Sequence, residues 1–491
     1  MAIITFVYPD FESLGVEYLM AACKTIGHHV HFVYYEADDT YTQLKKIPSY
    51  TKVATDILNT YPDIVAFSCV TDNYQHQLKV AKILKDSNPK VYTIFGGIHP
   101  TAVPEIVLLQ DVIDAVAIGE AEHSLPVFLN KCQLNSSFVF PEESVEGIVF
   151  KKNSLIIGDF QEGRLVDLDA LSFPEKEPIY KEIHDSTNEY RIITSRGCPY
   201  SCSYCFNSYM HNLRGGIKIR RRSVSNVIEE LILAKKMFSI KYVLFVDDSF
   251  TTDKRWIEQF SKEYKKEVGL PFACVGNPHY ITEAIAAHLA DAGCVNFQLG
   301  IQSLSENLCK ETLNRNSQNT QIAKAIHLLK QNKIMIQVDH MLGIPTDTLQ
   351  SQENAVLFYN IHRPQLISIF WLTYYPRTDI IQIAKKNGMI SQENIDCIEQ
   401  GIKLTNESYL TGGSLLNPQP YYSISFILNW MPLIPKPVVV FLIKSRIYRI
   451  FKIKNYYAST VFPRIIRSIL DKRDFRGRSH IIRFKNKIRS K

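Results

Sequence analysis

Residues 196–207 read RGCPYSCSYCFN, and the interpretation of the whole chain starts from this stretch. Cys198, Cys202 and Cys205 are spaced C-x3-C-x2-C, directly after an apolar run at Arg191–Ser195. Thiolates this close in sequence can converge on one soft metal centre. Three are too few to close a tetrahedral zinc site, whereas a cubane iron–sulfur cluster would keep one iron open for another molecule. The alternatives are three buried cysteines, or two zinc ligands and a bystander.

The cysteines stand at the start of a region, residues 190–386, in which apolar runs alternate with helical patterns. Six β/α units in succession predict an open or partial parallel barrel, with its chemistry at the carboxyl ends of the strands. The expected strands are Arg191–Ser195, Tyr242–Val246, Phe272–Val275, Val295–Leu299, Met335–Met341 and Leu366–Leu372. The expected helices are Val224–Phe238, Trp256–Val268, Ile281–Ala292, Ile322–Gln331 and Gln350–Asn360.

Upstream, residues 1–135 show the same alternation, which predicts a doubly wound parallel sheet. Ligands of such sheets bind at the carboxyl ends of the strands, beside helix N-termini. The expected strands are Ile3–Tyr8, His29–Tyr35, Asp63–Val70, Val91–Phe95 and Ala115–Ile118. The expected helices are Leu14–Ile26, Val53–Thr60, Tyr74–Lys85 and Ala121–Leu129.

Between the two regions, residues 147–158 read as a β-hairpin, followed by a polar, proline-containing stretch. We therefore predict an α/β protein in four parts. Residues 1–138 form the doubly wound sheet, 139–185 a hairpin and linker, 186–405 the barrel, and 406–491 a basic, helical C-terminal region.

Composition narrows the class of protein. The chain has 491 residues, of which 46% are apolar and 21% charged, and this excludes a disordered or collagen-like chain. Ten cysteines are too sparse for a secreted disulfide scaffold. The first residues, MAIITFVY, lack a basic stretch and a long apolar run, so they predict a strand and not a signal peptide. We expect a cytoplasmic protein with reduced thiols.

Charge is distributed unevenly. Residues 436–491 contain 17 Lys and Arg and two Asp, a local charge of +15, while the whole chain carries only +7. The apolar runs Tyr422–Pro432 and Pro437–Ile443 are too short to span a bilayer. Three interpretations remain open: the tail lies on an anionic membrane surface, at the inner face of the membrane; it binds nucleic acid, which we favour less; or it packs its apolar stripe on the barrel.

The cysteine segment closely resembles the radical S-adenosylmethionine (SAM) superfamily, whose motif is C-x3-C-x-aromatic-C with Tyr204 at the aromatic position. The resemblance implies a [4Fe–4S] cluster on Cys198, Cys202 and Cys205. It also implies that SAM binds the fourth iron through its amino and carboxylate groups. Electron transfer from the reduced cluster would then yield a 5′-deoxyadenosyl radical.

Segments after later strands match the same family. The family's methionine-amino contact corresponds to Asp248, and more weakly to Asp247, although many members have Gly-Gly-Glu there; an N-cap or a turn is the alternative. Gln302 and Ser303 stand where the family has a ribose-contacting Gly-Ile-Glu-Ser. Gly343 opens the segment that resembles the adenine-stacking loop. Taken alone, each is also consistent with an ordinary strand-to-helix turn.

The N-terminal region carries two further motifs, Gly96-Gly97-Ile98-His99-Pro100 and Gly119-Glu120-Ala121-Glu122. Glycines at strand ends allow close approach of a ligand, and acidic residues favour a helix N-terminus; plain helix capping is the alternative. Joined to the barrel, the region resembles the cobalamin-binding domain of one large subfamily, over residues 1–390. The resemblance implies that Gly96, Gly97, Gly119 and Glu120 lie against cobalamin.

One departure concerns the axial ligand of cobalt. Cobalamin proteins that ligate cobalt from below often use Asp-x-His-x-x-Gly, but here Glu12 occupies the histidine position. A carboxylate is a poor substitute for imidazole. If cobalamin binds, we predict no histidine lower ligand, with His76 and His99 as the fallback candidates.

The resemblance implies cobalamin-dependent methylation of an unactivated carbon in a small or lipid-like substrate, with a flavodoxin or ferredoxin as reductant. Four alternatives stay open: a cobalamin-dependent cyclase or rearrangement enzyme, a radical enzyme without cobalamin, an RNA- or protein-modifying enzyme, and a membrane-associated iron–sulfur carrier or sensor. Cys23, Cys69 and Cys132 are widely spaced and predict core thiols, not the extra cluster that methylthiolation enzymes carry.

Overall fold

The computed structural model describes residues 1–37, 49–134, 137–182, 189–404, 419–450, 453, 457–471, 473–475, 477–478 and 481. The chain divides into two compact units. The first consists of Met1–His184, Tyr204–Ile217 and Tyr374–Leu404, and the second of Asp185–Ser203, Lys218–Thr373 and Thr405–Lys491. The predicted four-part division stays a prediction; the compact units differ from it because residues 204–217 and 374–404 group with the N-terminal part.

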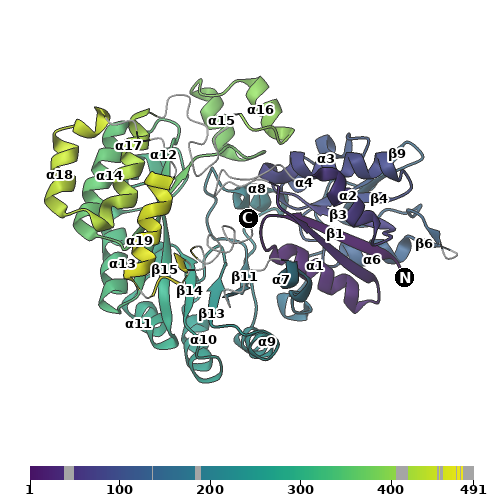
Figure 1. Ribbon diagram of the computed structural model, residues 1–491, viewed down its shortest axis with the longest axis horizontal. Coiled ribbons are helices and arrows are strands. Elements are labelled where there is room, and N and C mark those ends of the chain that lie inside the picture. Colours follow the sequence, from purple (N-terminus) through teal and green to yellow (C-terminus); the bar gives the residue numbers. More distant parts are fainter. Residues whose placement is uncertain are drawn as a thin grey trace. The chain divides into compact units, whose positions relative to one another are not determined.

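The first unit is built on a seven-stranded sheet of order β2-β1-β3-β4-β5-β8-β9, in which β1 to β5 run parallel (Figure 1). The predicted doubly wound sheet is confirmed. Its parallel strands are β1 (Ile3–Pro9), β2 (His29–Tyr35), β3 (Ile64–Ser68), β4 (Tyr92–Gly96) and β5 (Ala115–Ala117). Its helices are α1 (Leu14–Thr25), α2 (Tyr50–Leu58), α3 (Thr71–Ser87), α4 (Ile98–Ala102), α5 (Pro104–Leu108) and α6 (Ser124–Lys131).

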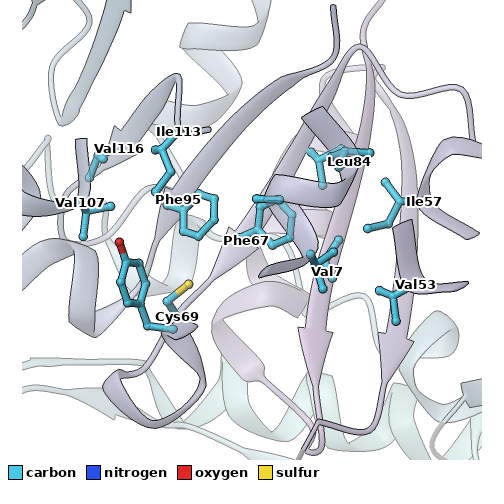
Figure 2. Close-up of a cluster of buried hydrophobic side chains, with 14 of the residues drawn as sticks. Val7, Val53, Ile57, Phe67, Cys69, Leu84, Phe95, Val107, Ile113 and Val116 are labelled. Carbon is cyan, nitrogen blue, oxygen red and sulfur yellow. The ribbon is translucent and has the colours of Figure 1, made fainter. Parts of the chain in front are cut away.

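Two apolar layers cover the two faces of this sheet, because side chains alternate along each strand. One layer contains Val7, Phe67 and Phe95, and Figure 2 shows their side chains packed together; the rings of Phe67 and Phe95 are stacked with centroids 4.7 Å apart. The other layer contains Phe6 and Ile94 and packs against α1 and α6. Burial of both faces explains why these strands are near-continuous apolar runs.

The predicted hairpin is present and continues the sheet. Strand β8 (Ile148–Lys152) pairs antiparallel with β5 and with β9 (Leu155–Ile157), so the hairpin is part of the first unit's sheet and not only a linker. The remaining elements of this unit are β6 (Gln133–Leu134), β7 (Ser137–Phe138), η1 (Leu168–Ala170), α7 (Glu177–Glu182), α8 (Phe206–Leu213), α15 (Asp379–Lys386) and α16 (Gln392–Glu399).

The second unit contains the predicted six-stranded parallel sheet, in the order β10-β13-β14-β15-β16-β17. The strands are β10 (Glu189–Ile192), β13 (Tyr242–Phe245), β14 (Phe272–Gly276), β15 (Cys294–Gln302), β16 (Met335–Leu342) and β17 (Leu366–Trp371). The helices are α9 (Val224–Met237), α10 (Lys254–Glu267), α11 (Glu283–Ala292), α12 (Glu306–Glu311), α13 (Asn319–Gln331) and α14 (Leu349–His362). A short antiparallel pair, β11 (Ser195–Arg196) with β12 (Arg220–Arg221), and η2 (Pro278–Tyr280) complete it.

The C-terminal region packs largely on this barrel. It consists of α17 (Gln419–Trp430), η3 (Met431–Leu433), α18 (Lys436–Lys444), η4 (Ile447–Ile450), a π-helical turn η5 (Tyr457–Val461) and α19 (Phe462–Leu470). Figure 1 shows α17 and α18 beside α14, and α18 buries Val439 and Ile443. Of the three interpretations of the basic tail, packing of an apolar stripe on the barrel therefore holds for α18. Among the described residues, no helix combines the length and the apolar character needed to cross a membrane.

Residues 473–475 cover the amino-terminal end of the barrel. The ring of Phe475 stacks on Tyr242, the first residue of β13, with centroids 4.9 Å apart and planes 11° from parallel. Arg473 donates a hydrogen bond to the carbonyl of Lys333, just before β16, at 2.8 Å. This leaves the opposite, carboxyl-terminal ends of the strands for the candidate site.

Candidate active site

The cysteine motif follows β11, and the boundary between the two units falls inside it. Cys198 and Cys202 belong to the second unit, and Tyr204 and Cys205 to the first, where Cys205 is the residue before α8. Cys202 is buried and the other two cysteines are partly exposed. No disulfide joins any of the ten cysteines, all of which lie in the described residues.

A segment that follows α12 braces the cysteine loop within the second unit. The hydroxyl of Ser203 donates to the carbonyl of Thr312 at 2.6 Å, and its amide donates to the carbonyl of Leu313 at 3.0 Å. The side-chain amide of Asn314 donates to the carbonyl of Ser201 at 2.8 Å. These bonds fix the backbone on both sides of Cys202.

Arg315 is the charged group beside the cysteine loop. Its guanidinium is buried, and Nη1 donates to the Sγ of Cys202 at 3.7 Å. Nη2 donates to the carbonyl of Gly300, and the guanidinium carbon lies 5.9 Å from the ring centre of Tyr200. The guanidinium therefore places a buried positive charge against the sulfur of Cys202.

The two predicted aspartates after β13 have different positions. Asp247 is buried and accepts hydrogen bonds from the amide and hydroxyl of Thr194 and from the hydroxyl of Ser195, at 2.5–3.2 Å. It therefore ties β13 to the start of the cysteine loop. Asp248 is exposed. Neither caps α10, whose N-cap is Asp253, so the capping alternative is wrong for both.

Gln302, Ser303 and Gly343 lie where two adjacent strands end. Gln302 is the last residue of β15, and not beyond it as expected, and it has φ of +70° next to a register shift against β16. Gly343 directly follows β16 with φ of +83°. The hydroxyls of Thr312 and Thr346 are 3.1 Å apart, so the segment that braces the cysteine loop also contacts the turn after Gly343.

The donor set of the cysteine loop fits an iron–sulfur cluster. Three thiols lie within eight consecutive residues, without disulfides, and a cation donates to one of them. Among the described residues, no group of three or more His, Cys, Asp or Glu side chains is already arranged around a metal position. The assignment of Cys198, Cys202 and Cys205 as ligands stays a prediction that rests on the chemistry of the motif.

In the first unit, two of the three glycines predicted to approach a ligand lie tightly against protein atoms. A Cβ on Gly97, which has φ of +94°, would stand 2.7 Å from the carbonyl oxygen of Cys69, so the chain requires glycine there for its own packing. A Cβ on Gly96 would make only an ordinary contact with Ala117. Gly119, with φ of +71°, lies under the side chain of Glu162. These glycines remain predicted cobalamin contacts, but local packing already explains two of them.

Glu120 pairs with a helix that the sequence did not connect to it. Arg214, at the end of α8, forms ion pairs with Glu162 at 2.6 Å and with Glu120 at 3.1 Å, and all three side chains are largely buried. Burial alone would lower the pKa of Arg214, but the two carboxylates outweigh it and raise the pKa. Helix α6 begins at Ser124, so Glu120 is not in its first turn. The pairs join the helix that follows Cys205 to the strand ends of the sheet.

Unpartnered polar atoms gather near Cys69, at the carboxyl ends of the strands. Neither the hydroxyls of Tyr35 and Tyr74 nor Nε2 of His99 has a hydrogen-bond partner among the described residues, and all three side chains are buried. The rings of Tyr74 and His99 lie 4.3 Å apart, and burial lowers the pKa of His99 to about 4. Buried polar atoms are normally satisfied. Donors and acceptors at this edge therefore fit the polar groups of a bound cobalamin.

The residue at the usual lower-ligand position is already engaged. Glu12 accepts a hydrogen bond from the ammonium of Lys176 at 2.7 Å, and the fully buried Lys176 also pairs with Glu17 at 2.7 Å. Burial would lower the pKa of Lys176, but the two carboxylates raise it well above its ordinary value. The fallback candidate His76 bonds the hydroxyl of Tyr50 at 2.5 Å. The absence of a histidine lower ligand stays a prediction.

Sequence reasoning missed Arg315, Arg214 and Glu162. Each acts across a long sequence separation, and a lone arginine or glutamate carries no periodic signal. The only available hint was their position: Arg315 follows the helix after β15, and Arg214 ends the helix after the cysteines.

Comparison with protein families gives two matches on the chain. The model described as the radical SAM superfamily matches residues 192–358, and the model described as the B12 binding domain matches residues 2–129. The first range covers the cysteine loop and most of the barrel but ends before β17, and the second covers the parallel part of the N-terminal sheet.

Several curated proteins are similar over most of the chain. An uncharacterized methyltransferase of Pyrococcus horikoshii is 26% identical over 78% of this chain and 80% of its own. An anaerobic magnesium-protoporphyrin IX monomethyl ester cyclase of Rubrivivax gelatinosus is 24% identical over 77% and 69% of the two chains. A cytidylyl-2-hydroxyethylphosphonate methyltransferase of Streptomyces wedmorensis is 24% identical over 69% and 71%.

Two solved structures share the fold. The radical SAM methyltransferase TsrM from Kitasatospora setae, solved with tryptophan and a SAM analogue, superposes with a TM-score of 0.61 at 14% identity, over 79% of this chain and 76% of its own. The cobalamin-dependent SAM radical enzyme OxsB, with aqua-cobalamin and SAM bound, gives 0.60 at 16% identity, over 84% and 59%. At these identities the likeness concerns the fold.

Proposed function

We propose that this chain, which belongs to the radical SAM superfamily and carries a B12-binding domain, is a cobalamin-dependent methyltransferase acting on an unactivated carbon of a small molecule. One observation carries the proposal: both domains lie on one chain, and the radical SAM domain begins with three closely spaced thiols. When bound, the [4Fe–4S] cluster supplies the electron that cleaves SAM, and cobalamin supplies a methyl carrier.

The residues that would hold these groups follow from the motifs. Cys198, Cys202 and Cys205 would ligate the cluster, beside Tyr204. Asp248, Gln302, Ser303 and Gly343 would contact SAM, and Gly96, Gly97, Gly119 and Glu120 would lie against cobalamin.

The chain's own contribution is to position these groups. Asp247 and the hydrogen bonds of Ser203 hold the cysteine loop on the ends of the strands. Arg315 holds a positive charge against the sulfur of Cys202. The ion pairs of Arg214 hold α8, which follows the last cysteine, on the first unit.

For the substrate and the reductant, we propose only the chemical class. Relatives named as methyltransferases act on small molecules such as cytidylyl-2-hydroxyethylphosphonate, which supports a small-molecule substrate here. A lipid-like substrate stays within the proposal. We propose a flavodoxin or ferredoxin as the electron donor.

A second candidate function is cobalamin-dependent ring formation. Its support is the similarity to the anaerobic magnesium-protoporphyrin IX monomethyl ester cyclases, which covers 77% of this chain in the Rubrivivax protein. The two reactions can be told apart by the fate of SAM, because only methylation transfers its methyl group to the substrate.

The test is anaerobic reconstitution with iron, sulfide and cobalamin, followed by incubation with methyl-deuterated SAM and dithionite in cell extract. We expect about four irons per chain, the absorbance of bound cobalamin, and both 5′-deoxyadenosine and S-adenosylhomocysteine. Mass spectrometry should find deuteromethyl label in a small-molecule fraction. 5′-Deoxyadenosine without S-adenosylhomocysteine or label would favour the cyclase, and a chain that binds no cobalamin would contradict both.

A further inference from the structure

Helix α19 is oriented with its polar side chains inward and its apolar side chains outward. Phe462, Ile466, Ile469 and Leu470 recur at helical spacing on one face, and the last two are each 69% exposed. On the opposite side Arg467 is only 7% exposed. A helix that merely packs on a barrel would bury its apolar residues and expose its polar ones; α18 buries Val439 and Ile443, although it also exposes Phe441.

The inward face is held by polar contacts, so the orientation is built into the fold. The hydroxyl of Ser468 donates to Asp474 at 2.6 Å, and Asp474 also accepts from the amide of Gly477 at 2.8 Å. Arg473, next in the chain to Asp474, is bonded to the barrel through the carbonyl of Lys333. Rotation of the helix to bury its apolar face would bring Arg467 and Ser468 out of these surroundings. The outward apolar face is thus a stable surface.

The segment of sequence that contains this helix is strongly basic. Residues 436–491 carry 17 Lys and Arg against two Asp, and the described part includes the exposed Lys444 and Arg446. Exposed apolar side chains within a strongly basic segment are what an anionic lipid surface binds. We propose that α19 is a docking surface for an anionic membrane, with Phe462, Ile466, Ile469 and Leu470 entering the lipid interface.

The other occupants fit less well. Nucleic acid would match the charge, but phosphates give no reason for an outward row of Phe, Ile and Leu. A second copy of this chain would bring two segments of charge +15 together. The surface is independent of the proposed function, since residues 473–475 that follow it lie at the amino-terminal end of the barrel, away from the cysteine loop.

The test is flotation of the purified full chain with vesicles of phosphatidylcholine alone or with 30% phosphatidylglycerol. We expect the chain to float with the anionic vesicles and to be released by high salt. The double variant Ile469→Ser, Leu470→Ser should lower the bound fraction at limiting lipid about tenfold, because it removes apolar side chains and no charge. The matched control is Leu155→Ser, Ile156→Ser on β9, whose side chains are 67% and 56% exposed in the other unit; it should float like the unsubstituted chain.

Thermal midpoints and 5′-deoxyadenosine formation should be the same for both variants, which shows that folding and the proposed reaction are intact. Absence of flotation by the unsubstituted chain would overturn the proposal. So would a double variant that floats normally, since binding would then be by charge alone. If the unsubstituted chain is a dimer and the double variant is not, the surface belongs to a second copy of the chain. If RNA displaces the unsubstituted chain and the double variant from the vesicles equally, the surface belongs to nucleic acid.

Discussion

Each unit buries a histidine near the carboxyl end of a parallel strand, and the two side chains have different partners. In the second unit, His340 uses both ring nitrogens, with Tyr359 at 3.1 Å and Gln352 at 2.8 Å. In the first unit, Nδ1 of His99 bonds Thr71 at 3.1 Å, and Nε2 has no partner in the described part of the chain.

The contrast separates a structural histidine from one at a candidate cofactor site. Leaving a buried polar atom without a hydrogen bond costs about 1–3 kcal/mol of stability. Such an atom is therefore expected where a bound molecule supplies the missing hydrogen bond. His340 completes its hydrogen bonds within the protein, whereas His99 lies among several buried polar atoms near Cys69 that have no partner in the described part of the chain. The following predictions test that difference.

The largest effect should come from the thiols. Replacement of Cys202 by alanine in the second unit should remove most of the iron and abolish measurable 5′-deoxyadenosine formation, because the cluster would lose one of its thiolate ligands. Cys397, a partly exposed thiol in α16 of the first unit, is the control, and Cys397→Ala should keep iron and activity. The iron and sulfide contents of the two variants are measured after anaerobic reconstitution. Equal iron in both variants would contradict the assignment of the motif.

The next effect concerns the ion pairs of the first unit. Arg214→Ala leaves Glu162 and Glu120 without their buried cation, and we expect a loss of about 3 kcal/mol in the free energy of unfolding of that unit, together with weaker retention of cobalamin. In the second unit, Lys265→Ala breaks an exposed pair with Asp291 and should cost below about 0.5 kcal/mol. Urea unfolding and gel filtration of the cobalamin-loaded chain measure both. Similar losses of unfolding free energy for the two variants would show that the buried ion pairs of Arg214 stabilise the protein no more than the exposed pair of Lys265.

Acid should destabilise both units through their histidines. Burial lowers the pKa of His99 and of His340 to about 4, below the ordinary 6.5 of an unfolded chain. The unfolded state therefore binds more protons, and stability that is present above pH 6.5 is lost as the pH falls toward 4, by about 1 kcal/mol per histidine at pH 5.5. His99→Gln should reduce the loss between pH 7.5 and 5.5 by that amount in urea titrations. An unchanged pH dependence would mean that His99 is accessible to protons in the folded state.

The smallest effect compares two tyrosine hydroxyls. Tyr359→Phe removes a partner of His340 and should cost about 1 kcal/mol, whereas Tyr74→Phe removes an unpartnered hydroxyl and should change stability by less than about 0.5 kcal/mol. Tyr74→Phe should nevertheless weaken cobalamin retention, because that hydroxyl is one of the atoms near Cys69. A Tyr74→Phe variant that loses stability but binds cobalamin normally would reverse the interpretation.

Much of this architecture follows from local pattern. The alternation of apolar runs with helical stretches predicted both parallel sheets, and the cysteine spacing located the candidate cluster. Pattern did not predict α4 and α5, which are short and begin in a glycine–proline segment, or the pairing of β8 with β5, because strand partners are set by tertiary packing.

The contacts that hold the site could not be predicted from the sequence, because they too depend on tertiary packing. Arg315 reaches Cys202 and Arg214 reaches Glu162 across long stretches of chain, and neither residue type indicates its partner. The sequence predicted an apolar stripe in the basic tail, but that prediction could not show that Arg467 of α19 would face inward.

The stacking of Phe475 on Tyr242 has a consequence for biogenesis. Domains generally fold from the N-terminus during synthesis. Here the strand that carries Tyr242 emerges from the ribosome early, and its aromatic neighbour emerges only after all six barrel strands and the helices that follow them. A nascent chain therefore leaves the amino-terminal end of its barrel, including Tyr242, uncovered until Phe475 has been synthesised. Chaperone contact should be concentrated between the synthesis of these two residues.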